Sequence, residues 1–212
     1  MTWIHLLSKS HIPFSVYKMY KGDSLIQPKT IKNTHILVIL QGILSMYHVL
    51  NKTEVICNSI VYTGHIITSN DSDYTYNYIS LRTSYIISLP ITTTDLNQYI
   101  DHKIFNQILY NYNNTLKQNI DINRIFIHKN IKFRLIQIII ILSMKFGIIH
   151  NQKIMIPLII HKIDLANILG GNINTINKIL KDLDDQKIVT YAKRNIYVHN
   201  IVFLKYYCYL LR

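Results

Sequence analysis

Ten residues in the second half of the chain have side chains that suit contacts with DNA. Asparagine amides and threonine hydroxyls can hydrogen-bond base edges, isoleucine can touch a thymine methyl group, and lysine or arginine can bind phosphates. Most of the ten lie in the segment KIDLANILGGNINTINKILK, which runs from Lys162 to Lys181. The candidate DNA-contact residues are Lys162, Asn172, Ile173, Asn174, Thr175, Asn177, Lys178, Lys181, Lys193 and Arg194.

The spacing of small and apolar residues in this segment predicts two helices joined by a tight turn. A helix-turn-helix requires a small residue where the helices cross, a glycine at the turn and apolar residues on the second helix that face the first. Ala166, Gly170, Ile176 and Ile179 meet these requirements. Asn172 is a natural N-cap for the second helix. The asparagines and lysines that follow are therefore expected on the outer face of that helix.

A hairpin with a basic tip is predicted directly after the second helix. Two alternating segments, Lys187-Ile-Val-Thr-Tyr and Ile196-Tyr-Val-His, are joined by Ala-Lys-Arg-Asn. Such a hairpin forms the wing of a winged helix-turn-helix, and Lys193 and Arg194 at its tip would meet backbone phosphates. The competing interpretation is an ordinary helical hairpin with a solvated charged face. The ordered series of helix, turn, helix and hairpin favours DNA binding.

The charge of the chain indicates a polyanionic partner. The formal net charge is +12, and residues 128–212 carry 13 Lys and Arg against 4 Asp and Glu. Nine of the twelve net charges therefore lie in this shorter part, and an excess of this size indicates nucleic acid or an anionic lipid surface. The alternative function is that of a basic RNA-binding or membrane-surface protein without a role in transcription. That alternative does not explain the helix-turn-helix spacing.

Motifs for catalysis, metal binding and membrane insertion are missing from the sequence. GxSxG, Walker-loop and HExxH patterns do not occur, and only 11 residues are acidic. Cys57 and Cys208 are too few for a disulfide framework or a four-cysteine cluster. The most apolar stretch, residues 135–144, has about half the length that crosses a bilayer. We therefore expect no enzyme, no metal, no membrane partner and no targeting segment.

The first ninety residues show short β-rich segments separated by turn signals. Alternating apolar segments predict strands at residues 15–20, 35–40, 44–49, 53–57, 59–68, 74–82 and 84–89. Short strands at regular intervals are typical of an antiparallel sandwich, jelly roll or small barrel.

After residue 90 the apolar period changes to that of a helix, predicted from about Asp101 to His128. Asn119 and Asn123 lie near the edge of its apolar stripe, where buried asparagine can fix the register of a helix pair. The stripe predicts a dimer contact, or else packing on the chain's own sandwich alone. A second helix is predicted from about Asn130 to Phe146, ending at Gly147 in a left-handed cap. The stripe consists of Ile104, Phe105, Ile108, Leu109, Tyr112, Leu116, Ile120 and Ile127.

The order of these parts resembles the superfamily of the cyclic-AMP receptor protein and the fumarate-nitrate regulator. Within it, the chain is similar above all to the global nitrogen-control regulators of cyanobacteria (NtcA-like) and their plastid-encoded relatives in red algae. The likeness begins near Phe14 and is most specific in the last third. It is carried by Arg134-Leu-Ile, Ile140-Ile-Leu, Lys145-Phe-Gly, His161, Asp182-Leu, Gln186-Lys-Ile and Ile196-Tyr-Val-His, and more weakly by Gln41-Gly, Thr68-Ser-Asn-Asp-Ser-Asp and Ser88-Leu-Pro-Ile.

The resemblance implies an α+β protein with an N-terminal antiparallel β-roll (a cyclic-nucleotide-binding-like jelly roll) over residues 1–100. A dimerisation helix over 101–128 and a winged helix-turn-helix DNA-binding domain over 129–212 would follow. It also implies a homodimer that binds palindromic promoter sites in double-stranded DNA and contacts RNA polymerase, as an activator or a repressor. The abundance of Ile, Asn, Lys and Tyr, whose codons are AT-rich, agrees with plastid coding. We therefore expect a regulator of nitrogen-responsive genes in the plastid (chloroplast) stroma, or otherwise in a bacterial-type cytoplasm.

The effector site that the resemblance implies is altered in this chain. The nitrogen regulators bind 2-oxoglutarate between the roll and the long helix, where the matching positions here hold Val61, Tyr62, Tyr74, Thr115 and Ile120. A buried dicarboxylate requires cationic or donor partners, and the charges of the family site are not kept. We therefore expect no cofactor. Weak effector-binding candidates are Tyr74, Thr115 and Arg82, the only arginine of the roll.

Overall fold

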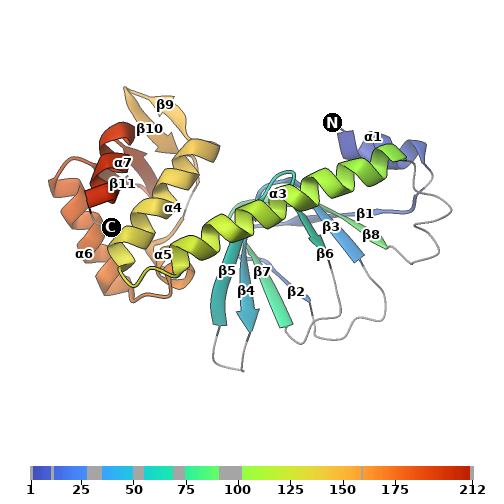
Figure 1. Ribbon diagram of the computed structural model, residues 1–212, viewed down its shortest axis with the longest axis horizontal. Coiled ribbons are helices and arrows are strands. Elements are labelled where there is room, and N and C mark those ends of the chain that lie inside the picture. Colours follow the sequence, from blue (N-terminus) through green and yellow to red (C-terminus); the bar gives the residue numbers. More distant parts are fainter. Residues whose placement is uncertain are drawn as a thin grey trace. The chain divides into compact units, whose positions relative to one another are not determined.

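The computed structural model describes residues 2–10, 12–27, 35–49, 55–68, 75–90, 102–158 and 160–210. The chain divides into two compact units, Met1–Asp121 (unit 1) and Ile122–Arg212 (unit 2). The colours in Figure 1 run from blue in unit 1 to red in unit 2. The helix α3 (His102–Phe126) begins in unit 1 and ends in unit 2. No described helix combines the length and the apolar character that crossing a membrane requires.

Unit 1 contains two four-stranded antiparallel sheets. One has the strand order β1-β8-β3-β6, and the other has the order β2-β7-β4-β5. The strands are β1 (Ser15–Met19), β2 (Ser24–Gln27), β3 (His35–Gln41), β4 (Ile43–Val49), β5 (Val55–Tyr62), β6 (Ile66–Thr68), β7 (Thr75–Ser80) and β8 (Ser84–Pro90). The predicted combination of antiparallel sheets with helices is confirmed.

The sheet that contains β3 is covered on both faces, which explains the unbroken apolar run of that strand. Side chains alternate between the two faces of a strand. Leu37 and Ile39 therefore face a core that also holds Leu44 and Val61 of the other sheet. Val38, between them, faces a second core formed with the helices. A strand that is buried on both faces reads as a continuous apolar segment rather than an alternating one.

The short helix α1 (Thr2–Lys9) covers part of the second face and was not predicted. Trp3 and Leu7 lie one helical turn apart, and both are buried against Ile104 and Ile108 of α3. Burying such side chains stabilises a fold by about 1.5–3 kcal/mol each. The N-terminal segment therefore belongs to the core of unit 1.

The apolar stripe predicted on α3 is divided between two surroundings. Ile104 and Ile108 pack inside unit 1, whereas Phe105, Leu109 and Leu116 are exposed. The stripe therefore does not pack on the chain's own sheets alone. Ile120 and Ile127 are exposed as well.

Three polar residues of α3 hydrogen-bond to the sheets of unit 1. The Thr115 hydroxyl accepts from the backbone N–H of Ile66 at 2.9 Å. The Gln118 side chain accepts from the hydroxyl of Tyr62, and the Asn119 side chain accepts from the hydroxyl of Ser59. Asn119 is thus half-buried and bonded within its own chain, while Asn123 is exposed. These bonds fix the first part of α3 on unit 1.

The predicted strands of unit 1 differ from the structure in several places. Residues 53–57 and 59–68 were predicted as two strands, whereas β5 runs without a break from Val55 to Tyr62. The segment 59–68 is interrupted because Thr63 to His65 form a turn, in which Gly64 has a positive φ of 88°. β2 was not predicted, since its four residues Ser-Leu-Ile-Gln are too few for a clear alternating pattern. Tyr74, with which one predicted strand began, lies outside the described residues.

Unit 2 contains helices around a four-stranded antiparallel sheet with the order β11-β12-β10-β9. Its apolar core is centred on α4, whose residues Leu135, Ile136, Ile138 and Ile139 are fully buried. The elements are α4 (Ile131–Phe146), β9 (Ile148–His150), β10 (Lys153–Ile156), α5 (Lys162–Leu169), α6 (Ile173–Asp185), β11 (Val189–Ala192), β12 (Asn195–Val198) and α7 (Ile201–Leu210).

The expectation of a left-handed cap at Gly147 was wrong. Its φ and ψ are −62° and 135°, which is an extended conformation. A Cβ atom at this position would lie 2.2 Å from the carbonyl oxygen of Ser143 and 2.4 Å from a methyl carbon of Ile154. The glycine is therefore required by the close approach of α4 to β10 and not by its dihedral angles.

Candidate nucleic-acid interface

Helices α5 and α6 are joined by the glycine turn that the sequence predicted. Gly170 ends α5 with φ 60° and ψ 42°, the left-handed conformation that glycine adopts at little cost. The N–H of Gly171 donates to the carbonyl of Ala166 at 2.9 Å, which closes the turn. Asn172 then caps α6, because its side chain accepts from the N–H of Asn174 at 2.8 Å. The predicted N-cap is confirmed.

Helix α6 has one buried face and one exposed face. Ile176, Leu180 and Leu183 are buried at the helical spacing of four and three residues. The opposite face carries Asn174, Lys178 and Lys181, which are all exposed. Ile173 is 38% exposed at the start of the helix, and Thr175 and Asn177 are half-buried on its flanks.

An ion pair to α4 fixes the orientation of α6. Lys132 on α4 donates a short hydrogen bond to Asp182 on α6, and its ammonium group lies 5.2 Å from the ring centre of Tyr207 on α7. The hydrogen bond from Lys132 lowers the pKa of Asp182. Partial burial alone would lower the pKa of Lys132. The interactions with Asp182 and Tyr207 together outweigh that effect and raise the pKa. One lysine therefore connects three helices.

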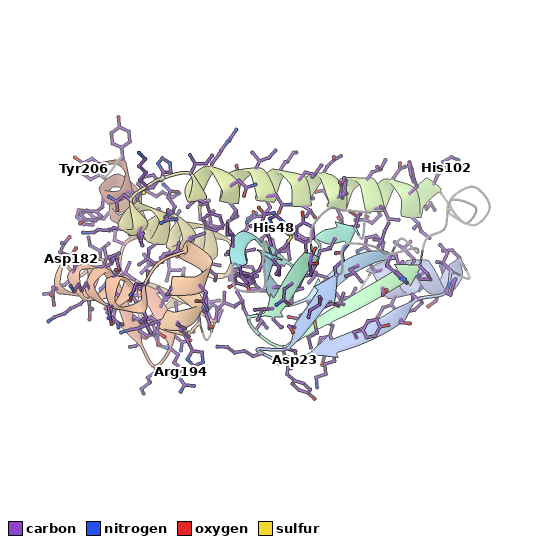
Figure 2. The ribbon with its side chains drawn as sticks, turned by 90° about the horizontal axis from the view of Figure 1, so that it is seen from below. Asp23, His48, His102, Asp182, Arg194 and Tyr206 are labelled. Atoms are coloured by element: carbon purple, nitrogen blue, oxygen red, sulfur yellow. The ribbon has the colours of Figure 1, made fainter. Side chains whose placement is uncertain are left out.

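The hairpin β11–β12 follows α6 and has cations at its tip. Ala192 pairs with Asn195, so the loop consists of Lys193 and Arg194 alone. Both have positive φ values, 50° and 65°, as a two-residue turn of type I′ requires. Figure 2 labels Arg194 at this tip, where its side chain points away from the ribbon. Asn and Gly usually occupy such turns, so two long cations here carry a conformational cost.

Polar contacts connect the base of the hairpin to both helices. The hydroxyl of Thr190 on β11 donates to Asp184 at the end of α6, at 2.6 Å. Its oxygen lies 2.7 Å from Nε2 of His199, whose pKa is lowered by burial and by nearby lysines. Tyr191 donates to the carbonyl of Ile160 at 2.8 Å, just before α5. The hairpin is thus joined to the end of α6 and to the segment that precedes α5.

Several cations of this surface have no partner within the described part of the chain. No salt bridge or hydrogen bond joins the side chains of Lys178, Lys181 or Lys193 to described residues. Lys162, in contrast, has a partner, because its ammonium group lies 5.2 Å from the ring centre of Tyr191. Unpaired cations on one face are available to an external polyanion, whose phosphates they can neutralise.

All ten candidate DNA-contact residues lie on α5, α6, the turn between them or the hairpin tip. Sequence reasoning missed Lys132, whose partner Asp182 lies 50 residues further along the chain. It also missed Tyr191, which packs under Lys162. No local pattern indicates either contact, because both depend on how α4, α5 and the hairpin pack.

The three effector candidates do not form one group. Thr115 lines a cavity of unit 1, whereas Arg82 lies at the turn between β7 and β8 and is not among the residues that line it. Tyr74 lies outside the described residues. Among the described residues, three or more His, Cys, Asp or Glu side chains do not come together in any group that could hold a metal ion.

The chain is similar over nearly its whole length to bacterial-type transcription regulators. It is 27% identical over 215 residues to the protein called HTH-type transcriptional regulator ycf28 of Porphyra purpurea, covering 95% of this chain and 85% of that protein. It is 21% identical over 210 residues to the global nitrogen regulator of Synechococcus elongatus, covering 96% and 94% of the two chains. No protein-family model matches the chain.

The fold is shared with a solved structure of the same kind. A transcriptional regulator of the CRP family from Thermus thermophilus superposes with a TM-score of 0.73 at 12% sequence identity, covering 91% of this chain and 96% of that one. The predicted similarity to the global nitrogen regulators is therefore confirmed, and the chain has the fold of a CRP-family regulator.

Proposed function

We propose that the chain is a transcription regulator that binds duplex DNA through a winged helix-turn-helix. In this proposal α6 enters the major groove, where Asn174 and Lys178 contact base edges. The tip of the hairpin β11–β12 holds the sugar-phosphate backbone with Lys193 and Arg194. The names of its relatives, among them an HTH-type regulator and a global nitrogen regulator, support this assignment.

One observation carries the proposal: the exposed face of α6 is polar and cationic, and the end of α6 is joined to a hairpin with a cationic tip. Asn174, Lys178 and Lys181 project from a helix whose other face is completely buried. Amide and ammonium groups match the donors and acceptors of the major groove and the phosphates beside it. A merely solvated helix face would not require a rigid connection to α4 and to the hairpin.

We further propose that the protein acts as a homodimer at palindromic promoter sites. Phe105, Leu109 and Leu116 form an exposed apolar row along α3, with about four-tenths of each side chain exposed. A second copy of the same helix would cover this row. Two recognition helices would then read half-sites about one helical turn of DNA apart, and a two-fold symmetric site would match the two-fold symmetric protein.

The setting that we propose is the plastid stroma, with RNA polymerase as a further partner. Composition and the relative from Porphyra purpurea support plastid coding. The global nitrogen regulator among the relatives supports control of nitrogen-responsive genes. Mapping the DNA fragments bound by the protein and by RNA polymerase in the organelle would identify these genes and show whether RNA polymerase is recruited or excluded.

A binding titration tests the proposed function. The full-length protein should bind a duplex selected from random sequences at least about a thousandfold more tightly than unrelated duplex DNA. Single-stranded RNA and vesicles of anionic lipid serve as competitors. If either competitor displaces the selected duplex at equal charge concentration, the alternative of a basic RNA-binding or membrane-surface protein would replace the DNA-binding proposal.

A further inference from the structure

Unit 1 contains a cavity between its sheets and α3 whose chemistry differs from that of the family site. Its volume is about 260 Å³. A buried apolar cavity of about 150 Å³ already admits benzene, so this space can hold a ligand larger than one ring. The lining residues are Gln27, Met46, Val61, Ile66, Ile67, Thr68, Tyr76, Tyr78, Tyr112, Thr115, Leu116 and Asn119.

The polar groups that the described residues contribute to the cavity wall are uncharged. None of the described lining residues is a lysine, arginine, histidine, aspartate or glutamate. Gln27, Tyr78 and Thr115 are each at least nine-tenths buried. Burial, with Tyr76 nearby, raises the pKa of Tyr78, so its hydroxyl stays neutral. The wall therefore offers hydrogen bonds and aromatic rings without a formal charge.

Some hydrogen-bonding capacity of this wall is used by the protein itself. The Tyr78 hydroxyl donates to the side-chain carbonyl of Gln27 at 3.3 Å, and the Gln27 amide donates to the carbonyl of Thr68 at 3.4 Å. Both bonds are long and therefore weak. Thr115 uses its hydroxyl fully, because it accepts from Ile66 and donates to the carbonyl of Asn111.

Other polar groups of the wall remain free for a ligand. The hydroxyls of Tyr76 and Tyr112 form no hydrogen bond to described residues. The Asn119 side chain accepts from Ser59 through its oxygen, which leaves its amide hydrogens unused. The Asn119 amide can only donate, and each free tyrosine hydroxyl can donate as well as accept. A ligand with acceptor atoms and a planar ring would match both these donors and the tyrosine rings.

A dicarboxylate such as 2-oxoglutarate does not match this wall. An anion that leaves water loses several kcal/mol of solvation, which neutral donors alone do not restore. Arg82 could supply a charge, but it lies at the β7–β8 turn and does not line the cavity. We propose that the cavity binds an uncharged, planar small molecule with hydrogen-bond acceptors in place of the dianion that the resemblance implies.

Three probes of equal shape and different charge test this proposal. Benzamide is neutral, benzoate is an anion and benzamidinium is a cation, and all three have one ring and a planar substituent. Calorimetry on the full-length protein should give saturable benzamide binding, with a dissociation constant of about the millimolar order expected for a fragment. Benzoate and benzamidinium should bind at least about tenfold more weakly. Dimethyl 2-oxoglutarate should likewise bind more tightly than 2-oxoglutarate.

A charge placed in the wall should reverse this preference. Asn119→Arg puts a cation on the α3 side of the cavity, and Thr68→Lys puts one on the β6 side. Either variant should bind benzoate more tightly than benzamide. Asn113→Arg is the matched control, because Asn113 is exposed on α3 and does not line the cavity, so its probe preference should stay that of the parent protein.

Two results would overturn the proposal. One is binding of benzoate or 2-oxoglutarate to the parent protein as tightly as the neutral probe. The other is no saturable benzamide binding to a protein whose thermal unfolding shows that it is folded. Because these measurements contain no DNA, their failure would leave the proposed DNA binding untouched, and a failed DNA titration would leave the cavity proposal untouched.

Discussion

Helices α3 and α6 both bury one face, but their exposed faces have opposite chemistry. On α3 the exposed row is apolar, with Phe105 44% exposed and Leu116 41% exposed. On α6 the exposed face consists of amides and ammonium groups, among them Asn174 and Lys178. The exposed faces of the two helices therefore suit different kinds of partner surface.

The difference indicates which partner each helix can accept. An apolar row gains free energy when another apolar surface removes it from water. An amide and lysine face gains little from such burial, but it fits a polyanion that supplies acceptors and negative charge. The difference between the two faces therefore favours a protein partner for α3 and DNA for α6, as proposed above.

The largest effect is expected on α3. Replacing Leu109 and Leu116 together with Asp should place four carboxylates in the proposed dimer contact. Burying unpaired like charges costs several kcal/mol, so the variant should sediment as a monomer and lose most of its affinity for a palindromic duplex. Sedimentation at micromolar concentration measures the first result, and a binding titration measures the second.

The control for this prediction lies on the same helix. Lys103 and Tyr110 are exposed on the side of α3 away from the apolar row. Their replacement with Asp adds at least as much negative charge and should leave the dimer intact. A parent protein that sediments as a monomer at micromolar concentration would contradict the assignment of α3 altogether.

The next largest effect is expected on the outer face of α6. Asn174→Ala or Lys178→Ala should remove base contacts and cost about 1–3 kcal/mol on the preferred duplex, with a much smaller loss on random DNA. The ratio of the two affinities is the measurement. Asn167→Ala, an exposed position on α5, is the control that should leave the ratio unchanged. An unchanged ratio in both α6 variants would show that this helix does not read the sequence.

A smaller and sequence-independent effect is expected at the hairpin tip. Lys193→Gly or Arg194→Gly should weaken binding to every duplex and reduce the slope of log affinity against log salt by about one for each lost phosphate contact. The same changes relieve a positive φ. The folded state should therefore be equally or more stable by about 0.5–1 kcal/mol. Loss of stability together with loss of binding would indicate a structural role for these cations.

The sequence predicted those features that depend on neighbouring residues. Gly170 and Asn172 fulfil local requirements for a left-handed turn and a helix cap, and the structure has both. The apolar stripe of α3 was located correctly, but its period does not tell which residues face unit 1. That division is set by distant residues, because Trp3 and Leu7 of α1 and Val38 and Ile87 of the sheet form one core with Ile104 and Ile108.

Features that depend on distant contacts or on mixed propensity were missed. Helix α7 reads IVFLKYYCYL, in which β-branched and aromatic residues favour a strand, yet it packs on α4 as a helix. The hairpin of β9 and β10 turns at Asn151 and Gln152, which both have positive φ, and its strands have only three and four residues. Tertiary packing overrides propensity in α7, whereas the strands of the β9–β10 hairpin are too short to give a clear alternating pattern.

The smallest effect is expected where α6 is joined to α4. Hydrogen bonding from Lys132 lowers the pKa of Asp182, so this contribution to stability is complete above the unfolded pKa of about 4 and is lost as the pH falls through the lower folded value. Asp182→Asn should cost no more than about 1 kcal/mol at neutral pH, because the Asp182 side chain is 45% exposed. The difference in urea midpoint between parent and variant should therefore shrink towards zero at about pH 3. Asp185→Asn, an exposed position at the end of α6, is the matched control. A constant difference at both pH values would mean that packing around Lys132, and not its charge pair, fixes the recognition helix.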